Sequence, residues 1–297
     1  HFREIRDSEN INCWDDATWK EMVDLGWSGI LVPEQFGGSE FGMAGISVIM
    51  QELGKTLTPS PILATSVLGV ATINMLGSEE QKSNYLPKIV SGEVTTALAI
   101  DEGNHHNPFN VEATAKLDGD HWILNGKKVF VIDGASADTI LIVARTSGKT
   151  GESNGISVFA VDKDSAELDI TKISTADSRN YANIEMSDLK LEQKALLGEQ
   201  DLAGETLEKI LGNQKQRGIF GEIQLENLLS NVLPPQLFQM QYSFKNNEVV
   251  DAIVKVNNFI IPIDAKFSLD NYNKMVESLD KEELESLEKK FKADIKN

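Results

Sequence analysis

The chain has 297 residues, 41% of them hydrophobic, which is enough to bury two or three separate cores. Its net charge of -18 argues against a broad nucleic-acid-binding surface, because phosphate contacts depend on concentrated Lys and Arg. A single cysteine, Cys13, excludes an internal disulfide and a cysteine-rich zinc site. The sequence has no run of roughly 18 apolar residues and no signal-peptide pattern, so we expect a cytoplasmic protein without membrane contact.

The charge is divided unevenly along the chain. Residues 1–212 contain 17 Lys and Arg against 33 Asp and Glu, whereas residues 213–297 contain 11 against 13. The composition therefore changes near residue 212, and we expect a domain boundary there.

Residues 15–92 are predicted to be helical, because apolar residues recur at helical spacing and the segments end at glycines. The run from Ser78 to Gln81 predicts a capping box at the start of the last of these helices. Pro87 lies inside that helix, where it is predicted to bend or shorten it. Residues 1–92 are therefore expected to form a helical domain.

From Val94 onward the hydrophobic period changes to two, which is typical of strands. Asp118-Gly119-Asp120 and Asn125-Gly126 are predicted to be tight turns. The predicted strands are residues 94–100, 111–117, 121–125, 128–132, 139–145, 156–162 and 182–191. A short helix is expected at 199–211. Helices followed by strands indicate an α+β multidomain architecture.

Three motifs in this first part resemble the acyl-CoA dehydrogenase family. They are LGWSGILVPEQFGG at 25–38, LDGDHWILNGKK at 117–128, and the run from Ala137 to Thr146. The resemblance implies the family's N-terminal domain for residues 1–92, truncated at its start. It also implies the family's middle β-domain, an antiparallel β-barrel or sandwich, for residues 93–197. Residues 198–212 would be a linker helix. It also implies FAD as cofactor, acyl-CoA as substrate, and a role in fatty acid oxidation.

The resemblance places the flavin against the β-domain, at Leu98, Ile100, Asp101, Phe130 and Ile132. The sequence departs from the family here: IDEGNHHN at 100–107 replaces the pattern LTEPGAGSD, and Ile132 stands where the family has a hydroxyl residue. The adjacent His105 and His106 point to opposite faces of an extended segment, so a loop is favoured over a metal site.

The run FVIDGASAD at 130–138 is closer to the small subunits of heteromeric enzymes such as pimeloyl-CoA dehydrogenase. Such a subunit would form a homo- or hetero-oligomer with an acyl-CoA dehydrogenase subunit. The family pattern ends near Leu211, before the bundle that carries the catalytic base. Without that base we expect no dehydrogenase activity from this chain alone.

The segment from Val249 to Lys266 predicts a β-hairpin. Two β-rich runs, 249–256 and 259–267, flank Asn257-Asn258, a pair of residues that suits a two-residue turn. In the resulting register, paired residue numbers sum to 515, so Val256 faces Phe259. Pro262 cannot donate a ladder hydrogen bond, and it is expected to mark an edge or a bulge.

In that register Asp251 faces Asp264, and Lys266 lies on the same face. Opposed carboxylates repel one another unless a cation neutralises them, and oxygen ligands favour Mg²⁺ or Mn²⁺. Lys266 would then position a water or stabilise charge on a phosphate. The alternative is an ordinary charged surface in which Lys266 screens Asp264, and spacing alone leaves both interpretations open.

Three further motifs resemble the RmuC family of DNA recombination proteins. They are QRGIFGEIQLENLL at 216–229, VDA at 250–252 and PIDAKF at 262–267. The resemblance implies a partial restriction-endonuclease-like α/β core in residues 213–297, with DNA as a partner. It assigns Asp251, Asp264 and Lys266 to the catalytic positions and adds Glu222 as a further carboxylate. Asp251, Asp264 and Glu222 would bind the metal.

Three functional hypotheses follow from these patterns. The first is an acyl-CoA-dehydrogenase-like flavin protein that lacks the catalytic bundle and is inactive as a dehydrogenase alone. The second is a metal-dependent nuclease in residues 213–297. The third is a non-enzymatic chimeric fragment, and a chimeric reading frame is favoured over a purposeful fusion.

Overall fold

The computed structural model describes residues 4–5, 10, 12–175, 179–212, 229, 234, 237–243, 249–256 and 259–263. The chain divides into two compact units, His1–Gly212 and Asn213–Asn297. In the described residues, no helix is both long enough and apolar enough to cross a membrane.

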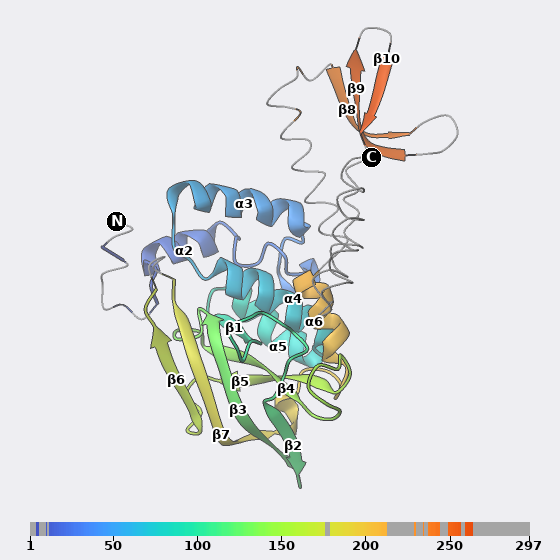
Figure 1. The fold of residues 1–297 in the computed structure, drawn as a ribbon. Coiled ribbons are helices and arrows are strands. Elements are labelled where there is room, and N and C mark those ends of the chain that lie inside the picture. The colour runs from blue at the N-terminus through green and yellow to red at the C-terminus, as the bar shows by residue number, and fades with distance from the viewer. Residues whose placement is uncertain are drawn as a thin grey trace. The chain divides into compact units, whose positions relative to one another are not determined.

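The first unit begins with helices, as predicted, and these lie together beside a sheet (Figure 1). Their bounds are α2 Asp16–Asp24, η1 Glu34–Phe36, α3 Gly42–Thr56, η2 Ile62–Gly69, α4 Val70–Leu76 and α5 Glu79–Val90. The predicted capping box is confirmed: the Ser78 hydroxyl accepts from the Gln81 N–H, and the Gln81 side chain accepts from the Ser78 N–H. Helix α5 continues to Val90 past Pro87, so the proline does not end it.

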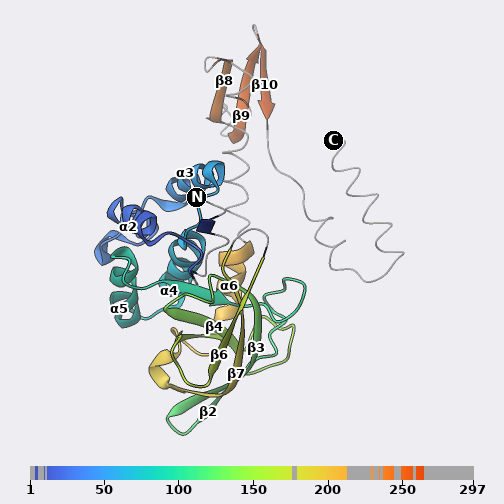
Figure 2. The same ribbon diagram turned by 90° about the vertical axis from the view of Figure 1, so that its left-hand side faces the viewer.

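A seven-stranded sheet follows, in the order β1-β4-β2-β3-β7-β6, with β5 paired to β4. The strands are β1 Thr96–Ala99, β2 Thr114–Asp118, β3 His121–Ile132, β4 Thr139–Arg145, β5 Ile156–Asp162, β6 Leu168–Ile173 and β7 Tyr181–Glu192. Most neighbours are antiparallel, although β1 and β2 pair with β4 in parallel. The sheet curls, as the turned view shows (Figure 2). The predicted order of a helical block and then a mostly antiparallel sheet is confirmed.

Two strand predictions were wrong. Strand β6 was not predicted, because its sequence LDITKI mixes charged and apolar residues. Asn125-Gly126 is not a turn but a register shift inside the continuous strand β3. Gly126 has φ +139°, and a Cβ there would meet the Ala113 Cα at 2.7 Å, so neighbouring backbone lies too close for a side chain.

Apolar residues form three clusters in the first unit. The largest lies within the curled sheet, where Trp122 meets Phe159 edge to face with ring centroids 5.3 Å apart. A second joins the sheet to α4, α5 and α6, Ala203–Gly212, and includes Leu98, Ile100 and Leu207. A third lies among the N-terminal helices around Ile46 and Ile62. The second cluster fixes helices against the sheet, and the third packs the N-terminal helices against one another.

The described strands of the second unit are β8 Phe238–Ser243, β9 Val249–Val256 and β10 Phe259–Ile263. They pair antiparallel in the order β10-β9-β8. The predicted hairpin register is confirmed over five pairs, from Phe259 opposite Val256 to Ile263 opposite Ala252. Pro262 pairs opposite Ile253 without a shift of register, and it lies on an edge strand of the described sheet.

Candidate functional site

The predicted flavin residues come from two segments that the fold brings together. The Asp101 carbonyl accepts a hydrogen bond from the Val129 N–H at 2.8 Å, so the residues after β1 lie against β3. Leu98 and Ile100 are buried in the second apolar cluster. Asp101 and Ile132 are partly exposed. Two of the five predicted residues therefore belong to the core, and the accessible ones, Asp101, Phe130 and Ile132, are referred to as the edge.

Phe130 is the exposed apolar side chain of this edge, with 54% of its surface accessible. It has φ +50° and lies within the register shift between Lys128 and Val131. Its ring meets the ring of Tyr181 edge to face, with centroids 6.4 Å apart. A left-handed conformation is unfavourable for a bulky residue, so the local structure holds Phe130 outward at some cost.

A buried ion pair lies under the same edge, which the sequence did not reveal. The fully buried Lys128 Nζ donates to Glu102 Oε1 at 2.6 Å and to the Ile100 carbonyl at 3.0 Å. Glu102 also accepts from the N–H groups of Glu112 and Ala113. Burial lowers the pKa of Lys128, and the nearby Glu102 carboxylate opposes that shift. The pair ties residues 100–113 to β3.

His106 belongs to the loop that was predicted instead of a metal site. Its Nδ1 lies 2.9 and 3.0 Å from the two carboxylate oxygens of Asp101. Among the residues described, no three His, Cys, Asp or Glu side chains gather as a metal site would require. The Asp101 carboxylate is therefore held by a neighbouring histidine.

The predicted metal site of the second unit is only partly covered by the structure. Asp251 lies on β9, but its side chain is outside the description. Asp264, Lys266 and Glu222 also lie outside the described residues. The confirmed register supports the hairpin on which this site was predicted, and the site itself stays a prediction.

Two family models, both of acyl-CoA dehydrogenase domains, match the first unit. Residues 1–93 match the acyl-CoA dehydrogenase N-terminal domain and residues 100–193 match the middle domain of that family. Residues 163–297 match the RmuC family, and the overlap at 163–193 includes β6 and β7. The chain therefore joins acyl-CoA-dehydrogenase-like domains to a segment of RmuC type.

Individual relatives support the same assignment. Acyl-CoA dehydrogenase FadE12 of Mycobacterium tuberculosis is 31% identical over 206 residues, which are 65% of this chain and 53% of the relative. Mitochondrial isovaleryl-CoA dehydrogenase of Pongo abelii is 35% identical over 150 residues, covering 49% of this chain and 35% of the relative. The chain thus spans about half the length of FadE12 and about a third of the length of the isovaleryl-CoA dehydrogenase.

A solved glutaryl-CoA dehydrogenase from Mycobacterium smegmatis, in complex with FADH2, has the same fold over the shared region. Its TM-score is 0.58 at 22% identity, with coverage of 70% of this chain and 57% of the other. This likeness concerns the arrangement of helices and strands.

Proposed function

We propose that residues 1–212 act as a flavin-binding subunit of acyl-CoA dehydrogenase type, with FAD held at the edge formed by Asp101, Phe130 and Ile132. The observation that carries this proposal is the exposed ring of Phe130 beside a partly exposed Ile132. Flat apolar surface of this kind fits an isoalloxazine ring. When bound, FAD supplies a hydride acceptor.

The chain's own residues would bind and orient the ring by packing. Ile132 has no hydroxyl, so the side chain at this position contributes apolar contact alone. The Lys128–Glu102 pair and the Asp101–His106 contact fix the loop that borders the edge. A preorganised surface lowers the entropic cost of binding.

The proposed substrate is an acyl-CoA thioester, and the proposed setting is an oligomer in the cytoplasm. Removal of the α-proton needs a positioned base, which contributes roughly 10²- to 10⁴-fold to the rate. The residues that follow α6 lie within the segment that matches RmuC. We therefore expect another acyl-CoA dehydrogenase subunit, identical or different, to supply the base, and the chain alone to be inactive.

Titration of the purified full chain with FAD tests this proposal through the quenching of flavin fluorescence. We expect saturable binding, with the affinity of Phe130→Ala reduced about tenfold. Phe41→Ala is the matched control, because Phe41 is another exposed phenylalanine at the start of α3. Absence of saturable binding, or equal binding by Phe130→Ala and the native chain, would contradict the proposal.

A second candidate is a Mg²⁺- or Mn²⁺-dependent DNA nuclease in residues 213–297. It is favoured by the RmuC match and by the confirmed hairpin register that ends beside Asp251. The proposed metal ligands are Asp251, Asp264 and Glu222, with Lys266 acting on the phosphate. DNA cleavage that needs either metal and is lost in Asp264→Ala would support this candidate. Asp169→Ala in β6 is a control, because this exposed carboxylate lies in the other unit.

A third candidate, consistent with the join between two families, is that the chain arose as a chimeric reading frame. In that case neither flavin binding nor metal-dependent cleavage is expected, and the chain is a non-enzymatic fragment. A continuous transcript across residues 190–220 in the source organism would contradict the chimeric origin.

A further inference from the structure

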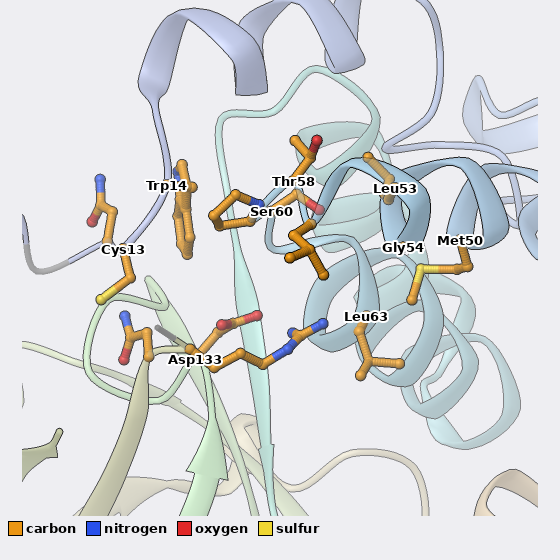
Figure 3. Close-up of a pocket in the computed structure, with 14 residues that line it drawn as sticks. Cys13, Trp14, Met50, Leu53, Gly54, Thr58, Ser60, Leu63 and Asp133 are labelled. Atoms are coloured by element: carbon orange, nitrogen blue, oxygen red, sulfur yellow. The ribbon is translucent and has the colours of Figure 1, made fainter. Parts of the chain in front are cut away.

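A cavity of about 390 Å³ lies in the first unit, and none of the five residues assigned to flavin lines it. Figure 3 shows Cys13 and Trp14 on one side and Met50, Leu53 and Gly54 of α3 on the other, with Asp133 between them. Residues distant in the sequence thus meet around one space. Its volume is within the range of small-molecule sites in proteins, roughly 300–1,000 Å³.

The walls of this cavity are largely apolar. Trp14 is buried, while Met50, Leu53 and Leu63 are partly buried and border the space. Such walls hold water poorly, because they offer it few hydrogen bonds. They would contact an aliphatic or aromatic group well.

One end of the cavity is polar and rigidly built. Asp133 follows β3 with φ +57°, and its N–H donates to the Asn180 carbonyl at 2.5 Å. The Asn180 side chain accepts from the Ala135 N–H at 3.1 Å and donates to the Ser136 hydroxyl at 2.6 Å. These bonds hold the loop after β3 against the segment before β7.

Asp133 brings an unsatisfied group to this end. Its side chain is only 4% exposed, and within the described structure its Oδ2 has no hydrogen-bond partner. Leaving a buried polar atom unpaired destabilises the fold, because the atom loses its hydration without gaining a partner. Among the described residues, three other buried side-chain atoms lack partners, those of Ser66, Thr96 and Asn183, but none of these residues borders this cavity. Asp133, whose Oδ2 is unpaired, is therefore also a wall residue of the apolar cavity.

The protonation state of Asp133 narrows the chemistry of a ligand head group. Burial raises its pKa to about 7, and the positive charge of Arg179, which also lines the cavity, acts in the opposite direction. Near neutral pH both the acid and the carboxylate are therefore populated. A hydroxyl can donate to the carboxylate or accept from the acid, so it suits both forms.

We propose that this cavity is a binding site for a small alcohol, whose apolar body contacts Trp14, Met50 and Leu63 and whose hydroxyl bonds to Asp133 Oδ2. The lining of this cavity includes none of the edge residues, although Asp133 directly follows Ile132, and the proposal does not require flavin. A ligand of this kind satisfies the buried oxygen and fills the apolar space at the same time.

Gly54 provides a way to close the cavity without straining the backbone. It lies in α3, and a Cβ built there meets no heavy atom within 4 Å. Gly54→Phe therefore adds a large side chain at the wall, whereas Gly54→Ala adds one methyl group and serves as the matched control. Alanine is also the better helix former.

The experiment is calorimetric titration of the full chain with 1-octanol. We expect saturable binding by the native chain and by Gly54→Ala, and binding at least tenfold weaker in Gly54→Phe. Asp133→Asn, which keeps the size of the side chain, is expected to bind about three- to tenfold more weakly. Circular dichroism and the melting temperature establish that each variant is folded.

Fluorescence locates the bound alcohol. The bromine of 8-bromo-1-octanol quenches tryptophan on contact, so it is expected to quench native emission and to lose most of this effect in Trp14→Phe. The proposal is overturned if the folded native chain does not bind octanol, or if Gly54→Phe binds it as tightly as Gly54→Ala. Equal binding of sodium octanoate would overturn the assignment of a hydroxyl head group.

Discussion

Two buried ionisable groups, five residues apart along the chain, differ in how the fold satisfies them. Lys128 is fully buried in β3, and its ammonium bonds to Glu102 and to the Ile100 carbonyl. Asp133, just after β3, is 4% exposed and has an unpaired oxygen beside a cavity. The Lys128 ammonium is therefore paired within the fold, whereas the unpaired oxygen of Asp133 is available to a ligand.

The difference shows that burial alone does not distinguish a structural charge from a binding one. A buried charge stabilises a fold only when hydrogen bonds compensate for its lost hydration. Lys128 meets that condition, and Glu102 meets it as well through the Glu112 and Ala113 N–H groups. Asp133 does not, so its carboxyl opposes folding unless it is protonated or bound.

The largest loss of stability is expected when the Lys128–Glu102 ion pair is broken. Glu102→Ala leaves the Lys128 ammonium buried without its carboxylate, and it also removes the acceptor used by two backbone N–H groups. We expect the free energy of unfolding to fall by about 3–5 kcal/mol, as measured by urea denaturation.

Glu52→Ala is the control for that experiment. Glu52 pairs with Lys55 at 2.6 Å, but both side chains are more than half exposed. Water screens such a pair, so we expect a change within about 0.5 kcal/mol. A similar loss in both variants would show that burial gives the Lys128 pair no special importance.

Asp133→Asn is expected to raise the free energy of unfolding, by less than Glu102→Ala lowers it. The pKa of Asp133 rises from 3.8 to about 7 on folding, so this residue makes the native chain less stable as the pH increases from about 4 to 7. The difference in pKa sets an upper limit of about 4 kcal/mol. We expect Asp133→Asn to be more stable than the native chain by about 2 kcal/mol at pH 8, with the advantage vanishing near pH 4.

Denaturation of both proteins across that pH range measures this difference. Asparagine is chosen because it tolerates the positive φ of this position. A constant difference between the two proteins from pH 4 to 8 would contradict a native pKa near 7.

The smallest of these changes in stability is expected from substitution of Asp138, whose carboxylate does have hydrogen-bond partners. Burial favours a higher pKa, but hydrogen bonds from the Thr95 N–H and hydroxyl and from Lys163 outweigh it and lower the pKa. Its contribution to stability is present above the unfolded pKa of about 3.8 and is lost as the pH falls through the lower native value.

Asp138→Asn is therefore expected to be less stable than the native chain at pH 7, by at most about 1 kcal/mol because the side chain is 42% exposed. The loss should shrink as the pH falls below 4. A pH dependence with the same sign as that of Asp133→Asn would contradict the contrast between satisfied and unsatisfied carboxylates.

Local patterns predicted much of the fold. The capping box at Ser78 and the register that pairs Phe259 with Val256 were correct, because each depends on residues close together in the chain. The prediction at Gly126 failed because Asn-Gly favours a turn locally, whereas Gly126 continues a strand past the backbone of Ala113. Family motifs led to the prediction that Phe130 contacts flavin, but they did not predict its left-handed backbone.

The sequence by itself determined that a helical block precedes a block of strands, that the family changes along the chain and how the hairpin is paired. Hydrophobic period and motif spacing, on which these depend, are properties of neighbouring residues. The tertiary structure alone decided that Lys128 would be satisfied and that Asp133 would not. Their partners and walls come from segments far away in the chain, such as Glu102, Trp14 and Asn180. Hydration and pairing of a charge depend on that packing.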